Sequence, residues 1–390
     1  MLVEPEHSSG KLAIGVRLWS SLAQAEPAWR ALERDGLLTP YQGFDWISQL
    51  SAARGERDAV KVVEFSADGR AVALLPLILR RRAGMVLGEI YGSDLSNSDW
   101  LIQARDVTLD PGALAMAFAL LRADLGRLDV LRFSNLPPSW EGVGNPLLAF
   151  PHQPAPDHFY VAPMGAGAEP RLTKKRRVDI VRGKKRLEEQ FGPVTLHRAD
   201  TVAAIERAHA AFLAQRGQRF AEMGIANIFA EPYFVRFFHD AAIAGIGHAK
   251  PALCFHTLEA GGEVLATAIG TCTNRHYSQY INSNTDGPAA KYSLIGLLML
   301  ELSAELDAAG ITSIDMGIGD FAYKTAWADR TEVFDLLIPL SPGGQVLAGA
   351  LRLTAGIKRT IKQNEALWSL AKRVRGALLR RGDAGKTDND

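Results

Sequence analysis

Hydrophobic and polar residues follow one order along the first half of the chain and then repeat it. Residues 16–36 open with a short apolar segment, continue with two serines, and end with apolar positions at helical spacing. Residues 194–217 show the same pattern, with Asp200 or Thr201 as the helix-capping residue. Each segment therefore predicts a short strand followed by a capped amphipathic helix.

Each half continues with an aromatic helical segment and then a β-hairpin. Two hydrophobic runs, 60–79 and 252–271, are interrupted by the turn dipeptides Asp68-Gly69 and Gly261-Gly262. Such dipeptides favour the positive φ angles of a tight hairpin turn. The aromatic segments before them contain Phe44, Trp46 and Ile47 in the first half and Tyr233, Phe234, Phe237 and Phe238 in the second.

The remaining elements complete the repeat with a strand, a capped helix and a last strand. The corresponding segments are 89–102 and 276–286, 112–125 and 293–308, and 128–136 and 311–319. Matching features lie roughly 180 to 195 residues apart, about half the chain, as a tandem duplication of one domain requires. Mixed strands and helices in this order predict the α+β class, with one mixed sheet in each half.

The segment 151–170 is rich in Pro, Gly and Ala, so we expect a loop there and a domain boundary within it. The predicted units are an N-terminal domain over 1–160 and a C-terminal domain over 161–345. A third segment, 346–390, predicts a basic amphipathic helix followed by a disordered polar tail.

Composition adds the class of protein and its expected compartment. The 390 residues are 47% hydrophobic and 22% charged, an ordinary globular mixture. The N-terminus lacks the pattern of a secretory signal, and two cysteines suggest a reducing compartment, so we expect a cytoplasmic protein. With Gly261-Gly262 as the turn, Cys254 faces about residue 268 rather than Cys272, which predicts two free thiols.

The net charge of +1 conceals two strongly basic segments. Residues 171–186 hold nine Lys and Arg against one Asp, and residues 352–381 hold nine against one Glu, so each carries +8 and the rest of the chain −15. The first segment lacks interleaved aromatic residues, so no specific nucleic-acid partner is expected. The second, Arg352–Arg381, is predicted to pack on the body or to contact an anionic membrane surface.

Two stretches carry a resemblance to a known family: YSLIGLLMLELSAELDAAGITSIDMGIGDFAYKTAW (292–327) and the basic helix TKKRRVDIVRGKKRLEEQFG (173–192). They resemble GNAT acyltransferases, and the duplicated arrangement resembles the FemABX proteins. The residues further resemble the CelD-like acetyltransferases of cellulose and exopolysaccharide synthesis. The resemblance, over roughly 15–345, implies acetyl-CoA or another acyl-CoA as cosubstrate and a sugar or polysaccharide precursor as acceptor. The first half would be a degenerate copy that shapes the acceptor cleft between the domains.

Binding of coenzyme A needs a cradle for its diphosphate, and unpaired amides at a helix N-terminus provide one. The candidate residues are Lys291, Tyr292, Ser293 as the cap, and Gly296. An ordinary helix start is the alternative. The glycines Gly317 and Gly319 allow either close approach of a ligand or a sharp turn.

Four residues after the cradle are candidates for catalysis. The resemblance places Tyr323 where a tyrosine could protonate the departing thiolate, and Lys324 could orient or neutralise substrate oxygens. Core packing is the alternative for Tyr323. Asp315, in an apolar strand, is either a base with a raised pKa or a structural carboxylate that caps the loop or pairs with Lys324. Asp320 is either part of the site or a turn residue. No metal-ligand spacing is present, so no metal site is expected.

Two other functions stay open at this point. A FemABX-type transferase with aminoacyl-tRNA as donor would explain the basic helix at 173–192. A catalytically silent GNAT-like scaffold of a polysaccharide-synthesis complex would explain why the sequence around Lys291 and Ser293 departs from the usual GNAT cradle.

Overall fold

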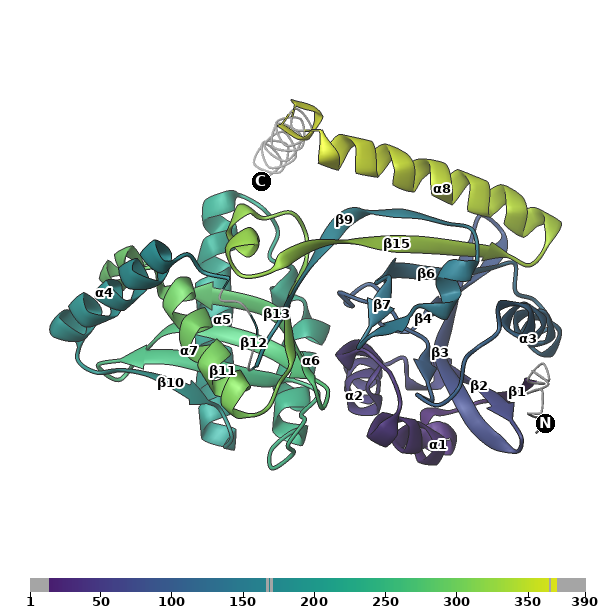
Figure 1. Cartoon of the computed structure of the whole chain (residues 1–390), viewed down its shortest axis with the longest axis horizontal. Helices are drawn as coiled ribbons and strands as arrows, with labels where there is room; N and C mark the ends of the chain where they lie inside the picture. The colour runs from purple at the N-terminus through teal and green to yellow at the C-terminus, as the bar shows by residue number, and fades with distance from the viewer. Residues whose placement is uncertain (1–13, 166–167, 169–170, 365, 370–390) are drawn as a thin grey trace, which may run out of the picture.

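The computed structural model describes residues 14–165, 168, 171–364 and 366–369 (Figure 1). The first half contains, in order, β1 (Gly15–Trp19), α1 (Leu22–Asp35), α2 (Phe44–Arg54), β2 (Lys61–Ala67), β3 (Arg70–Arg82), β4 (Met85–Ile90), β5 (Ile102–Gln103), α3 (Pro111–Asp124), β6 (Val130–Leu136), the short pair β7 (Ser139–Trp140) and β8 (Val143–Gly144), and β9 (His152–Pro163).

The second half contains α4 (Lys174–Phe191), β10 (Val194–Arg198), α5 (Val202–Met223), α6 (Pro232–Ala244), β11 (Cys254–Ala260), β12 (Glu263–Cys272), β13 (His276–Asn284), the 3-10 helix η5 (Pro288–Tyr292), α7 (Leu294–Ala308), β14 (Ser313–Ile318), the 3-10 helix η6 (Ala322–Ala326), β15 (Asp329–Pro339) and α8 (Pro342–Gln363). The α+β class and the repeated order of elements are confirmed.

Local signals in the sequence account for how these elements begin and turn. Thr201, one of the two predicted caps, accepts a hydrogen bond from the Ala204 backbone N–H and starts α5. The hairpin turn at Asp68 and Gly69 has φ angles of 49° and 79°. The equivalent turn at Gly261-Gly262 has 59° and 81°, so both hairpins use the left-handed turn that the dipeptides predicted.

The strands of the two halves join into one continuous sheet with the order β1-β2-β3-β4-β6-β15-β9-β14-β13-β12-β11-β10. This order reads as a mirror of itself, because each first-half strand in it has a second-half counterpart at the same distance from the centre. β5 pairs with β3 outside this order, and β7 and β8 form a separate two-stranded sheet. The two central strands, β9 and β15, are exchanged. β9 follows β6 in the chain but pairs with β14, and β15 follows β14 but pairs with β6 (Figure 1).

The prediction of a loop over 151–170 is therefore wrong for most of that segment, because residues 152–163 form β9. The boundary drawn between residues 160 and 161 falls inside that strand. β9 pairs with β15 from Val161↔Asp329 to His152↔Leu336, and also with β14. The partner residues of β9 lie 150 or more positions away in the sequence, so the local Pro and Gly content could not reveal them.

One hairpin register also differs from the prediction. Cys254 pairs with Gly270 rather than residue 268. The turn itself would place Cys254 opposite Ile269, and a β-bulge at Leu258 and Glu259 shifts the pairing by one further residue. Both cysteines are free thiols, as expected.

The two aromatic helices of the repeat pack against each other and hold the halves together. The ring of Trp46 on α2 lies edge-on to Phe237 on α6, with 4.9 Å between the ring centroids. It also contacts Tyr280 on β13 at 5.8 Å and is almost fully buried. Helix α2 of the first half and α6 of the second thus contribute to one shared hydrophobic core.

Helix α8 lies along the central strands of the sheet (Figure 1). Leu347 and Ala348 pack on apolar residues of β4, β6 and β15. Three of its cations also face the body: Arg352 donates to the Leu337 carbonyl, Arg359 pairs with Glu332, and Lys362 pairs with Asp157. Packing on the body, one of the two predicted roles, is confirmed for this helix, and the cations from Lys372 to Arg381 lie outside the described residues. None of the helices in the described ranges is long and apolar enough to span a membrane.

Candidate functional site

The N-terminus of α7 follows β13 through η5, as the cradle prediction requires. Ser293 occupies the N-cap position, but with a φ of 57°, and its side chain makes no capping hydrogen bond in the described structure. Its hydroxyl instead accepts a hydrogen bond from the Arg176 guanidinium of α4 at 3.3 Å. The first turn of α7 thus has a neighbouring cation and no side-chain cap, an arrangement that favours an anion.

Helix α4 lies directly against this end of α7. A Cβ on Gly296 would stand 3.3 Å from the Ile180 side chain, so the glycine lets the two helices approach closely. The Tyr292 hydroxyl donates to Gln190 of α4 at 2.6 Å, and the Lys291 ammonium lies 5.0 Å from the Tyr292 ring. All four predicted cradle residues therefore gather where the basic helix meets α7.

Asn97 of the first half lies between the parallel strands β13 and β14, beyond their last paired residues. Their pairing ends at Ser278↔Asp315. Asn97 then accepts a hydrogen bond from the Ile318 backbone N–H at 3.3 Å and donates to the Tyr41 hydroxyl at 2.6 Å. Gly317 has a φ of 71°, and a Cβ there would stand 2.8 Å from the Asn97 amide. The close approach predicted at Gly317 is thus made by Asn97.

Asp315 is fully buried in β14, at 0% exposure. One carboxylate oxygen accepts the Gly317 N–H at 2.7 Å, and the other lies 2.7 Å from the His276 Nε2. The predicted pairing with Lys324 is wrong, because His276 takes that place. The bond to Gly317 caps the β14 loop, which agrees with the structural alternative for Asp315.

Asp320 is not a simple turn residue, because its carboxylate links two elements that are far apart in the sequence, β9 and α8. It accepts hydrogen bonds from the Tyr160 hydroxyl of β9 at 2.9 Å and from the Gln363 amide of α8 at 2.8 Å, and it lies 3.1 Å from the His158 Nδ1. Burial alone would raise the pKa of Asp320, but these hydrogen bonds outweigh burial and hold the pKa below its ordinary value. Gly319, with a φ of 106°, donates its N–H to the His158 carbonyl beside this network.

Tyr323 and Lys324 are neighbours on η6 but have opposite environments. Tyr323 is 46% exposed, so the core-packing alternative is wrong. Partial burial still raises the pKa of its phenol, and Arg216 and Asn282 oppose that shift. Lys324 is only 3% exposed, and its ammonium donates to the Ile318 carbonyl at 2.7 Å. Burial lowers the pKa of Lys324 from 10.5 to about 8 despite three nearby aspartates.

This buried lysine predicts a pH dependence of stability. Between pH 8 and 10.5 the unfolded chain keeps a proton on Lys324 that the native protein has lost, so stability rises with pH across that window. The contribution is at most about 3 kcal/mol. Urea unfolding at pH 7, 9 and 10 should therefore show a smaller rise for Lys324→Met than for the parent chain. Equal slopes for both proteins would contradict a depressed pKa.

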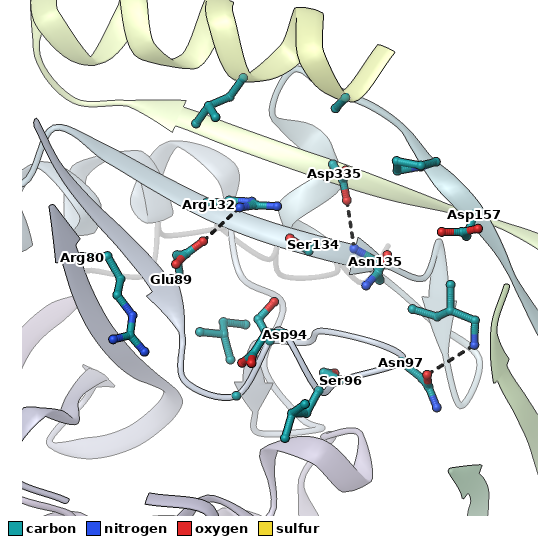
Figure 2. A pocket seen from close by; sticks show the side chains of 18 of the residues that line it. Arg80, Glu89, Asp94, Ser96, Asn97, Arg132, Ser134, Asn135, Asp157 and Asp335 are labelled. Carbon is teal, nitrogen blue, oxygen red and sulfur yellow. Dashed lines mark hydrogen bonds and ion pairs between the residues drawn. The ribbon is translucent and has the colours of Figure 1, made fainter. Parts of the chain in front are cut away.

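A cavity of about 800 Å³ lies between the two halves beneath α8 (Figure 2). The first half contributes Arg80, Glu89 and Arg132 to its wall, and the second half contributes Asp335 on β15 together with Phe229, Tyr280, Ile281 and Ile318. The sequence predicted a cleft between the domains but none of these residues. Nothing local distinguishes Arg132 or Asp335, because their shared position depends on the exchanged strands.

The cavity also contains the first-half counterpart of the Gly317 bulge. β6 has a register shift opposite Phe334 and Leu336 of β15, and Asn135 within it has a φ of 53°. Its backbone N–H donates to the Asp335 carboxylate at 3.2 Å, as Figure 2 shows. Both halves therefore open their parallel strands at a bulge with one left-handed residue. Across the described ranges, no group of three His, Cys, Asp or Glu side chains is placed to hold a metal ion.

Comparison with known proteins agrees with this architecture. Residues 174–325 match a family described as the acetyltransferase (GNAT) domain. The crystal structure of FemX superposes with a TM-score of 0.57 at 10% identity, over 85% of this chain and 99% of FemX. The C-terminal domain (DUF2156) from Agrobacterium fabrum, described as that of a lysylphosphatidylglycerol synthetase, gives 0.50 at 10% identity, over 86% and 96%. At these identities the likeness shows the fold alone.

No curated protein sequence matches the chain. The family match covers α4 to η6, and thus the α7 N-terminus and β14. The second half of the chain matches the GNAT acetyltransferase domain, and this match identifies the protein as an acyltransferase.

Proposed function

We propose that the protein transfers an acyl group from acetyl-CoA or another acyl-CoA to an amine or hydroxyl of a sugar or polysaccharide precursor. The observation that carries this proposal is the cavity, which extends from the opened strands of the first half to Tyr280 and Ile318 on β13 and β14 of the GNAT domain. Its volume is within the range of small-molecule sites, about 300 to 1,000 Å³. The donor would bind on the second half and the acceptor in the cavity.

On the donor side, the diphosphate of coenzyme A would lie at the first turn of α7, beside Arg176 and Lys291. The exposed phenol of Tyr323 would protonate the leaving thiolate, since its raised pKa keeps it protonated at neutral pH. The buried contacts of Asp315, Asp320 and Lys324 support positioning roles, in which they hold β14 and η6 in place.

The test is calorimetric titration of the full chain with acetyl-CoA, followed by an assay of free-thiol release with amino sugars as acceptors. We expect binding that weakens in Arg176→Ala, because that variant removes the cation at the α7 N-terminus. Arg122→Ala, on α3 of the first half, is the matched control. Absence of acetyl-CoA binding at millimolar concentration would overturn the proposal in favour of the scaffold function or a tRNA donor.

The aminoacyl-tRNA alternative draws support from the basic face of α4. Only Ile180 and Leu187 of this helix are buried, so most of its Lys and Arg side chains are accessible. RNase sensitivity of donor use would distinguish that donor from acyl-CoA. A CelD-like role in polysaccharide synthesis, a cytoplasmic location, and a membrane contact through Arg352–Arg381 belong to the same proposal and rest on the sequence. For the membrane contact, binding to anionic vesicles should be compared before and after removal of residues 370–390.

A further inference from the structure

The cavity under α8 has a charged floor made by strands in the middle of the sheet. Strands β3, β4, β6, β15 and β9 cross it in that order and lead to β14 of the second half. Register places Glu89 opposite Arg132 on β4 and β6, with an ion pair of 3.2 Å between them. Central strands covered by a helix are normally apolar on that face. Charges beneath α8 therefore indicate a face built to meet a polar ligand.

The N-terminal part of α8 packs on an apolar part of the sheet, which differs from the charged strand residues that line the cavity. Leu87, Val130 and Leu337 contact α8 near its N-terminus. Two residues further along the same strands, and so on the same face, lie Glu89 and Arg132. There the wall of the cavity is formed by Leu351, Thr354 and Lys358 of α8. The change from apolar to charged residues on β4 and β6 thus coincides with the start of the cavity under the helix, while α8 itself stays against β9.

Two ion pairs, Arg54–Asp94 and Glu89–Arg132, lie within the lining of the cavity, and the other charges on its strands are ordered along it. Cations lie at the β3 end, where Arg80 and Arg82 share one strand face. Arg80 pairs with Glu56 at 3.1 Å, whereas Arg82 has no ion pair within the described residues. Carboxylates lie toward the second half, where Asp335 is on β15 and Asp157 on β9. Figure 2 shows Arg80 at one end, Asp335 between, and Asp157 with Asn97 at the other.

Asp335 is the least compensated of the acids. Its only hydrogen bond in the described structure is from the Asn135 N–H, and no ion pair reaches it. Burial raises the pKa of Asp335, with the Asn135 N–H and the charges of Arg132 and Lys358 opposing that shift. A cationic group of a ligand beside this carboxyl would offset the cost of its burial. Asp157, in contrast, already pairs with Lys362.

We propose that the acceptor of this transferase is a small molecule with two opposite charges, an anionic phosphate or carboxylate held by Arg80 and Arg82 and an amine held by Asp335. This inference rests on the proposed function and narrows it to N-acylation. The strand order turns the amine toward β14 and the GNAT domain, and places the anionic group at the far end of the cavity. The acceptor's charge pattern would therefore select which of its ends is acylated.

The test is calorimetric titration of the full chain, without acyl-CoA, with four sugars that differ in charge. Glucosamine 6-phosphate carries an amine and a phosphate, and muramic acid an amine and a carboxylate. Glucosamine has only the amine, and glucose 6-phosphate has only the phosphate. Each charge-assisted contact is expected to change affinity by about 10- to 100-fold. The two-charge sugars should therefore bind at least about 10-fold more tightly than either one-charge sugar. Whichever of glucosamine 6-phosphate and muramic acid binds more tightly shows whether the anionic group is a phosphate or a carboxylate.

Variants of the cavity residues test which side chains bind the anionic group of the sugar and which bind its amine. Arg80→Ala with Arg82→Ala should weaken only the anionic sugars, and Asp335→Asn only the sugars with an amine. Arg81→Ala is the matched control, because it removes the same charge from the opposite face of β3. Equal binding of all four sugars, no binding of any at millimolar concentration, or the same loss in Arg81→Ala would overturn the inference. Since acetyl-CoA binding is measured separately, an intact donor site with no sugar selectivity would leave the proposed function standing.

Discussion

Replacing Tyr323 by phenylalanine is expected to lower kcat by about 100-fold, the lower part of the range for a lost general acid. The change removes only the phenolic hydroxyl from a side chain that is 46% exposed on η6. Because the ring remains, binding of acyl-CoA should be unchanged, so KM for the donor should stay close to that of the parent chain. Steady-state thiol release at saturating donor measures the effect.

A matched variant separates the chemistry from a general effect of losing a tyrosine hydroxyl. Tyr233→Phe makes the same change on α6, outside the GNAT cradle and β14, and should leave kcat within a factor of about two. If Tyr323→Phe retains full kcat, another group or a water molecule protonates the thiolate, and the proposed role of Tyr323 is wrong.

Trp46→Ala is expected to have the largest effect on stability, a loss of about 3 to 5 kcal/mol in the free energy of unfolding. The indole is 1% exposed and lies between Tyr41 of the first half and Phe237 and Tyr280 of the second. Removing it leaves a cavity in the core shared by the two halves. Urea unfolding followed by circular dichroism measures the loss.

Met116→Ala on α3 provides the control, because this side chain is largely exposed and its removal should change stability by less than about 0.5 kcal/mol. If Trp46→Ala costs no more than the control, the contact between α2 and α6 does not stabilise the joined halves, and the exchanged strands alone hold them.

What the sequence predicted well depends on neighbours along the chain. The hairpin turns at Asp68-Gly69 and Gly261-Gly262 follow from backbone preferences within two residues, and the cap of α5 from one side chain within a turn of its partner. The start of α7 after Ser293 was predicted in the same way, from a helix start after a strand, and the binding role of Lys291 to Gly296 stays a prediction.

What it missed depends on residues brought from the other half. β9 reads as a loop because its Pro and Ala residues form no pattern of their own, and its pairing is supplied by β14 and β15. Asp320 reads as a turn residue because Tyr160 and Gln363 are 160 and 43 positions away. The cavity likewise exists only once both halves and α8 are assembled.

The mirrored strand order has a consequence for the origin of the chain. Because β9 completes the sheet of the second half and β15 that of the first, neither copy could form its present sheet alone. A single-copy ancestor with this sheet would have been a symmetric dimer whose subunits exchanged their last strands. Fusion of two such genes would have let the copies diverge, and the cavity between the former subunits would then have been able to acquire unlike ends.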